Sequence, residues 1–208
     1  MYGFVGRITK QKGILMVLDI VEKFMHAYKF KCQFLIAGPI DPRDPYGQAC
    51  AGKMKYLSNK YPHNFWADPF LFFKDGELLT CACDFGMMPS AFEPGGIVQH
   101  EFFVANTPVL AFKTGGLKDS VFNYSKRTQK GNGFVFDDYN ADALYMCFEQ
   151  GWHLFQKKDH YHQLRKNAYD GAIDIRDQGI SWNKEFYKLT NKVFHNFSKN
   201  FRFLLIRK

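Results

Sequence analysis

Short apolar runs alternate with stretches in which apolar residues recur every three or four positions. The runs predict strands and the periodic stretches predict helices, because these are the side-chain repeats of the two structures. Strands are expected at residues 2–6, 32–37, around 65, 84–88, 108–112 and 133–136, and helices at 14–28, 47–60, around 78–79 and 96–105. This alternation predicts an α/β fold, a doubly wound, Rossmann-like parallel sheet with helices on both faces.

The C-terminal third is helical in pattern after Asp138. The last helix is expected to begin at Ser181, whose hydroxyl would cap it, with Glu185 close to the position that completes a capping box. At 208 residues, one large domain is the default, and we assign it residues 1–196. Residues 197–208 form a tail of undefined role.

Composition narrows the class of protein. With 46% hydrophobic and 18% aromatic residues, the chain is too apolar for a disordered protein. No apolar run reaches the length of a membrane span, so no membrane partner is expected. The absence of a secretory signal and the odd number of cysteines, five, favour reduced thiols and a cytoplasmic location.

The net charge of +8 suits an anionic ligand. The basic residues are scattered and match no nucleic-acid-binding module, so nucleic acid is not the expected partner. No cluster with metal-ligand spacing is visible, so no metal is expected.

Three loops at predicted strand ends carry the candidate chemistry. Residues 6–13 place Arg7 and Lys12 just before a helix, where two cations and free backbone N–H groups can hold a diphosphate. This loop matches neither a P-loop nor the GxGxxG fingerprint. Residues 113–119 contain a Gly-Gly pair at another strand-to-helix turn.

The loop at residues 92–101 contains Glu93, followed by Pro94, Gly95 and Gly96, and then Glu101. The glycines let the backbone approach a ligand closely. On a helix, two residues eight apart lie about 12 Å apart along the axis, with azimuths about 80° apart. Two carboxylates so placed can hold separate hydroxyl groups of one extended ligand.

The order of four motifs resembles the C-terminal domain of glycogen and starch synthases. These motifs are GRITKQKG, PSAFEPGG with a second Glu eight residues after the first, FKTGGLKDSV and GNGFVFDD, with ISW near the last helix. Those enzymes are retaining glucosyltransferases of the two-domain GT-B fold. The resemblance runs from Tyr2 to about Phe194 and implies that the chain is the C-terminal half of that fold.

The resemblance implies a role for each matching residue. Catalysis falls to Arg7 and Lys12, at the donor diphosphate, and to Glu93, near the transferred glucose. Glu101 matches the residue that holds the ribose. The remaining donor-binding positions belong to the two glycine loops: Gly95, Gly96, Ile97, Val98, Thr114 and Gly115. For the base, Phe70, Leu71 and Phe72 lie in the right stretch, and a core role for them is equally open.

The implied reaction transfers glucose from ADP-glucose or UDP-glucose to an α-1,4-glucan with retention of configuration, without a cofactor. The acceptor would bind the N-terminal GT-B domain, which this chain lacks, so the chain is expected to be an inactive part of a larger synthase. That enzyme is expected in the cytoplasm, or in a plastid where the parent chain carries a transit peptide. Two alternatives stay open: another retaining GT-B glycosyltransferase, and a non-catalytic nucleotide-sugar or glucan-binding module.

Overall fold

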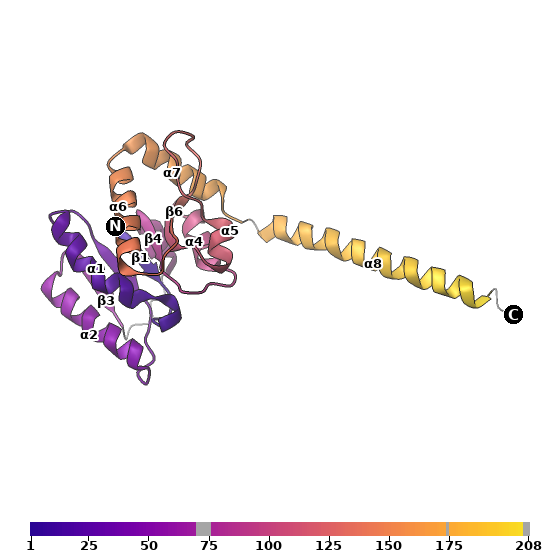
Figure 1. Ribbon diagram of the computed structural model, residues 1–208, viewed down its shortest axis with the longest axis horizontal. Helices are drawn as coiled ribbons and strands as arrows, with labels where there is room; N and C mark the ends of the chain where they lie inside the picture. Colours follow the sequence, from indigo (N-terminus) through magenta and orange to yellow (C-terminus); the bar gives the residue numbers. More distant parts are fainter. Residues whose placement is uncertain (70–75, 174, 206–208) are drawn as a thin grey trace. The chain divides into compact units, whose positions relative to one another are not determined.

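Six parallel strands, in the order β3-β2-β1-β4-β5-β6, form the centre of the computed structural model (Figure 1). The structure describes residues 1–69, 76–173 and 175–205. The strands are β1 (Tyr2–Val5), β2 (Phe34–Ala37), β3 (Phe65–Asp68), β4 (Phe85–Met88), β5 (Val109–Phe112) and β6 (Gly133–Phe136). All six predicted strands are therefore confirmed.

Helices cover both faces of the sheet (Figure 1). In chain order, the helices of the described residues are η1 (Lys10–Lys12, a 3-10 helix), α1 (Ile14–Ala27), α2 (Pro45–Lys60), α3 (Gly76–Ala82), α4 (Ile97–Val104), α5 (Gly115–Ser120), α6 (Ala141–Phe155), α7 (Lys158–Asp170) and, in a separate unit, α8 (Ile175–Leu205). Helices α1, α2 and α6 pack on one face, and α3, α4 and α5 pack on the other. The predicted doubly wound architecture is confirmed.

An aromatic cluster fills the core under α1 and α6. The ring of Tyr2 stacks against Phe34, Phe85 and Phe148, with centroids 5.0, 5.5 and 5.2 Å apart. These residues come from β1, β2, β4 and α6, so the cluster joins the middle of the sheet to the helix that covers it. Offset aromatic pairs add to the free energy gained by burying the rings.

The opposite face of β1 lies close to α3. A Cβ at Gly3 would lie 2.1 Å from Sγ of Cys83 and 2.8 Å from Leu79. Glycine at this position therefore lets α3 and the turn after it approach the strand. Two helix starts also follow from local sequence, because Asp44 accepts a hydrogen bond from the Tyr46 N–H and Asn140 accepts one from the Ala143 N–H.

One prediction about the C-terminal region is wrong. Helix α8 begins at Ile175, so Ser181 lies inside the helix and does not cap it. Residues 175–180 include no proline, and Gly179 lowers helix stability by about 1 kcal/mol without stopping the helix. The compact unit spans Met1–Ala172, and Ile173–Lys208 forms a second unit, whereas the sequence pattern places the end of the domain at residue 196.

Candidate functional site

The strand order reverses between β1 and β4, which are neighbours in the sheet. In open α/β sheets, ligands bind beside the carboxyl ends of the strands at such a reversal. The loop after β1 (residues 6–13) and the loop after β4 (residues 89–96) flank this point, and the loop after β5 (residues 113–114) lies on the next strand. The fold therefore brings the three predicted loops to one edge of the sheet.

The first two loops are joined by backbone contacts. The Ala91 N–H donates to the carbonyl of Gln11 at 2.8 Å, and the Gln11 side-chain amide donates to the carbonyl of Phe92 at 2.8 Å. Gly13 has a φ of +68°, and a Cβ there would lie 2.1 Å from the Pro89 carbonyl oxygen. These contacts hold the loop after β1 against the loop after β4.

An ion pair lies between the same two loops. Lys12 Nζ is 2.5 Å from Glu93 Oε2, and the Ser90 hydroxyl donates to the same oxygen at 3.1 Å. Both charged side chains are largely shielded from water, with exposed fractions of 17% for Lys12 and 12% for Glu93. Because a charge-assisted hydrogen bond is strong and directional, each side chain fixes the position of the other.

The third loop packs on the backbone of Glu93. The Gly116 N–H donates to the Glu93 carbonyl at 2.8 Å, and the Thr114 hydroxyl donates to the Ala91 carbonyl at 3.3 Å. Gly115 has a φ of +45°, and a Cβ there would lie 2.1 Å from the Glu93 carbonyl oxygen. Glu93 is thus held through its side chain by the first loop and through its backbone by the third.

The start of α4 presents an open backbone. A Cβ at Gly95 would meet no atom within 4 Å, and Gly96 has a φ of +65°. The first N–H groups of α4, including those of Ile97 and Val98, have no intrahelical acceptor and can bind an anion. Gln99 is fully buried beneath this turn, and its amide donates to the Ser120 hydroxyl at 3.0 Å.

Two predicted site residues lie apart from the ion pair. Arg7 is exposed in the loop after β1, and within the described residues it makes no ion pair. Glu101 is exposed on α4 and lines a groove of about 400 Å³ between α3 and α4, together with Glu77 and Thr80. Burial lowers the pKa of His100, which lines the same groove.

The predicted helical spacing of Glu93 and Glu101 is wrong. Helix α4 begins at Ile97, after the left-handed turn at Gly96, so Glu93 is not a helical residue. The estimated separation and azimuth, which assumed one continuous helix, therefore do not apply. The candidate base-binding residues Phe70, Leu71 and Phe72 lie outside the described residues.

Sequence reasoning missed the supporting residues of the site. Ser90, only 1% exposed, and Gln11 were quoted within motifs and given no role. Their signal is their position, because Gln11 directly precedes Lys12 and Ser90 lies three residues before Glu93, and each carries a side chain that can hydrogen-bond. In the part of the chain that the structure describes, no group of three or more His, Cys, Asp or Glu residues has a metal-binding arrangement.

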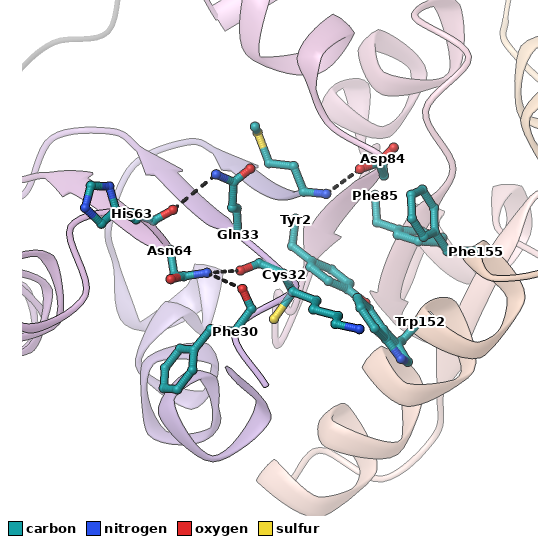
Figure 2. A pocket seen from close by; sticks show the side chains of 12 residues that line it. Tyr2, Phe30, Cys32, Gln33, His63, Asn64, Asp84, Phe85, Trp152 and Phe155 are labelled. Atoms are coloured by element: carbon teal, nitrogen blue, oxygen red, sulfur yellow. Dashed lines mark hydrogen bonds and ion pairs between the residues drawn. The ribbon is translucent and has the colours of Figure 1, made fainter. Parts of the chain in front are cut away.

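A separate cavity of about 430 Å³ lies at the amino ends of the strands (Figure 2). Its polar side chains bind other parts of the protein: the Asn64 amide donates to the carbonyls of Phe30 and Cys32 at 2.8 and 2.7 Å, and Gln33 donates to the His63 carbonyl at 3.1 Å. The first residue's amino group pairs with Asp84. None of the predicted site residues lines this cavity.

Comparison with known proteins identifies the family. The model of the group 1 glycosyl transferases matches residues 1–171, which is nearly the whole compact unit. The chain therefore belongs to the group 1 glycosyl transferases.

Curated relatives of this chain include glycogen synthases. A glycogen synthase from Aeromonas salmonicida is 31% identical over 180 residues, which cover 85% of this chain and 35% of the relative. A second glycogen synthase, from Geobacter sulfurreducens, is 32% identical over 197 residues, covering 92% of this chain and 37% of the relative. The chain thus spans about a third of the length of these curated relatives.

Solved structures show the same fold. The catalytic domain of starch synthase IV from Arabidopsis thaliana, bound to ADP and acarbose, superposes with a TM-score of 0.73 at 23% identity, over 90% of this chain and 37% of that one. The C-terminal domain of a group 1 glycosyl transferase (LpcC) from Francisella tularensis superposes with a TM-score of 0.64 at 17% identity, and 82% of each chain is covered. These likenesses confirm the predicted fold class. In the described residues, no helix has the length and apolarity that a membrane span requires.

Proposed function

We propose that this chain is the donor-binding domain of a glucan synthase that transfers glucose from a nucleotide diphosphate glucose to an α-1,4-glucan, with retention of configuration. The observation that carries the proposal is the shielded Lys12–Glu93 ion pair at the point where the strand order reverses. The glycogen synthase relatives support the glucan as the product. The acceptor would meet a second domain, as the one-third coverage of those relatives suggests.

Lys12 and Arg7 are assigned to the diphosphate. The Lys12 ammonium has three N–H donors, so its bond to Glu93 leaves two for phosphate oxygens. Negative charge develops on the departing diphosphate during transfer, and cations and helix N-terminal N–H groups already in place stabilise that charge. Arg7, which has no ion-pair partner in the described part of the chain, adds a second cation at the same edge.

The glycine loops are assigned to the sugar. Open space at Gly95 and the free N–H groups of Ile97 and Val98 leave room for a hydroxyl or phosphate oxygen against the backbone. Thr114 and Gly115 hold this backbone from the other side through Ala91 and Glu93. Glu93 would then lie near the transferred glucose, while its bond to Lys12 keeps it oriented.

Glu101 is assigned to the ribose. Its groove between α3 and α4 runs along α4 from Ile97, which directly follows Gly96, past Glu101. One donor molecule can therefore extend from the glycines along the helix. Two adjacent ribose hydroxyls suit a carboxylate, which has only acceptor atoms.

Titration calorimetry on the full chain tests the proposal. We expect ADP-glucose or UDP-glucose to bind at one site, ADP to compete, and Lys12→Ala and Arg7→Ala each to weaken binding by about tenfold or more, because each removes a charge-assisted contact. Comparing the affinities for ADP-glucose, UDP-glucose and ADP also identifies which nucleotide base the site prefers. A folded chain that binds none of the three ligands contradicts the donor assignment.

A further inference from the structure

A second groove, separate from the three loops, lies between α2 and the edge strand β3. It has a volume of about 610 Å³, within the range of small-molecule sites. The α2 residues that line the groove recur every three or four positions, so they share one face of the helix. The opposite wall consists of Trp66, Ala67 and Asp68 of β3 and of Pro69, which follows the strand. None of the residues assigned to the donor lines it.

Trp66 gives this groove an exposed aromatic ring. It lies on the outermost strand of the sheet and keeps 41% of its surface exposed, whereas its neighbour Phe65 is only 2% exposed. An indole face attracts the weakly positive C–H bonds on one face of a pyranose ring, because the π-system carries negative charge on its face. A large ring held at the protein surface is thus suited to a sugar.

Polar side chains across the groove supply hydrogen bonds. Lys55 and Asn59 are exposed on α2, one turn apart, and within the described residues they form no ion pair or hydrogen bond. An amide both donates and accepts, and an ammonium donates, so together they can bind the hydroxyl groups of a neutral sugar.

A peptide strand does not suit this edge. The Ser58 hydroxyl contacts both the N–H and the carbonyl of Ala67, at 3.3 and 3.4 Å. A strand added to β3 would need such backbone groups for its own hydrogen bonds. Because Ser58 of α2 already bonds to the backbone of Ala67, a ligand in the groove would be bound by side chains rather than by the backbone of β3.

We propose that the groove of Trp66, Lys55 and Asn59 is a second binding site for an α-1,4-glucan chain, distinct from the site of transfer. This inference rests on the proposed function for the identity of the sugar. A polymer held at a second place on the domain would raise the local concentration of chain ends near the donor site, without any new contact at the reaction centre.

Affinity electrophoresis of the full chain in gels containing glycogen, with maltoheptaose titration followed by tryptophan fluorescence, tests the site. Trp66→Ala should weaken maltoheptaose binding at least tenfold, Asn59→Ala by about threefold, and Trp66→Phe by less than Trp66→Ala. The matched control is Tyr56→Ala. Tyr56 is an exposed aromatic residue on α2 that does not line the groove, so its removal should leave maltoheptaose binding unchanged. Cello-oligosaccharides of equal length should bind more weakly than maltoheptaose.

Three results would overturn the inference: a full chain that does not bind glycogen, an unchanged affinity in Trp66→Ala, or an equal loss in Tyr56→Ala. Melting temperatures of all variants identify any loss that comes from unfolding, and Trp66→Phe reports on the ring where Trp66→Ala is unstable. Calorimetry with the nucleotide sugars on the same variants separates the two proposals. Donor binding without glucan binding removes this site alone, and glucan binding without donor binding removes the donor site alone.

Discussion

The two ends of the sheet differ in what their polar groups bind. At the amino ends of the strands, the amides of Asn64 and Gln33 donate to backbone carbonyls around a cavity (Figure 2), and the carboxylate of Asp84 accepts a hydrogen bond from the Tyr161 hydroxyl. At the carboxyl ends, the N–H groups at the start of α4 have no intrahelical acceptor, and Arg7 is exposed. The first end uses its polar groups for stability, whereas the second leaves them available to a ligand.

The difference shows why the size of a cavity does not mark a site. The amino-end cavity measures about 430 Å³ and is lined by none of the predicted site residues, whereas the three loops at the other end gather around an ion pair. In a two-domain enzyme, a cleft is completed only when the second domain closes over it. The chemical groups are in place on one domain before the cleft exists.

The largest expected effect is on turnover, which should depend on residues at the carboxyl ends of the strands and not on residues at the amino ends. In the two-domain synthase proposed to carry this domain, Lys12→Ala and Arg7→Ala should each lower turnover by about 10²–10³-fold, since each removes a group that stabilises developing charge. Lys31→Ala, which removes a lysine from the amino-end cavity, should leave turnover within about twofold. Steady-state kinetics measures all three, and near-wild-type turnover in both Arg7→Ala and Lys12→Ala would remove the diphosphate assignment.

The next test compares two glycines at the carboxyl ends of the strands, one expected to affect mainly the stability of the fold and the other mainly donor binding. Gly115→Ala should lower the free energy of unfolding by about 2–4 kcal/mol, because its Cβ would collide with the Glu93 carbonyl at a left-handed φ. Gly95→Ala should leave stability within about 0.5 kcal/mol, because its Cβ enters open space. That same Cβ would occupy space assigned to the donor, so donor binding should weaken about tenfold.

Urea unfolding and calorimetry on the two glycine variants give the readout. Equal stability losses in Gly115→Ala and Gly95→Ala would show that the loops do not pack as described. Unchanged donor affinity in Gly95→Ala would show that the donor does not approach that glycine.

The sequence predicts the sheet and the three loops well, because both follow from local patterns. Each strand is a short apolar run, and parallel strands bring their carboxyl ends to one edge. The pairing of Lys12 with Glu93, 81 residues away, does not follow from local pattern, since it depends on the register of β1 against β4. The role of Gln11 has the same cause, because its partner, the Phe92 carbonyl, lies in another loop. The role of Ser90 depends instead on the turn that folds its hydroxyl back onto Glu93, three residues along the chain.

The C-terminal helix shows the opposite failure. Its local signal, a serine followed by a glutamate four residues later, resembles a helix start, yet α8 begins earlier at Ile175. A capping signal stabilises a start only where the preceding residues do not continue the helix. Residues 175–180, which come directly before Ser181, contain no proline to prevent that.

A smaller effect tests the structural role of the amino end. Asn64→Ala should lower the free energy of unfolding by about 1–3 kcal/mol, because it leaves the buried carbonyl of Cys32 without its partner. The same amide also holds Phe30, which has a φ of +57°, so its loss releases a strained turn. Gln33→Ala, which removes one exposed hydrogen bond from the same cavity, should cost less. Donor affinity should be unchanged in both variants, and a tenfold loss in either would make the amino end part of the site.

The last test, which affects neither turnover nor stability, concerns the low reactivity of one thiol. Cys32 lines the amino-end cavity, and burial raises its pKa to about 11, so about a thousandth of it is thiolate at pH 8. The exposed thiol of Cys81 should therefore react with iodoacetamide at least about 10²-fold faster than Cys32, as peptide mapping by mass spectrometry can measure. Because the thiolate is the reactive form, labelling of Cys32 should rise as the pH approaches 11. Comparable labelling of the two residues at pH 8 would mean that the amino-end cavity opens to solvent and activates its thiol, and the contrast between the two ends of the sheet would then fail.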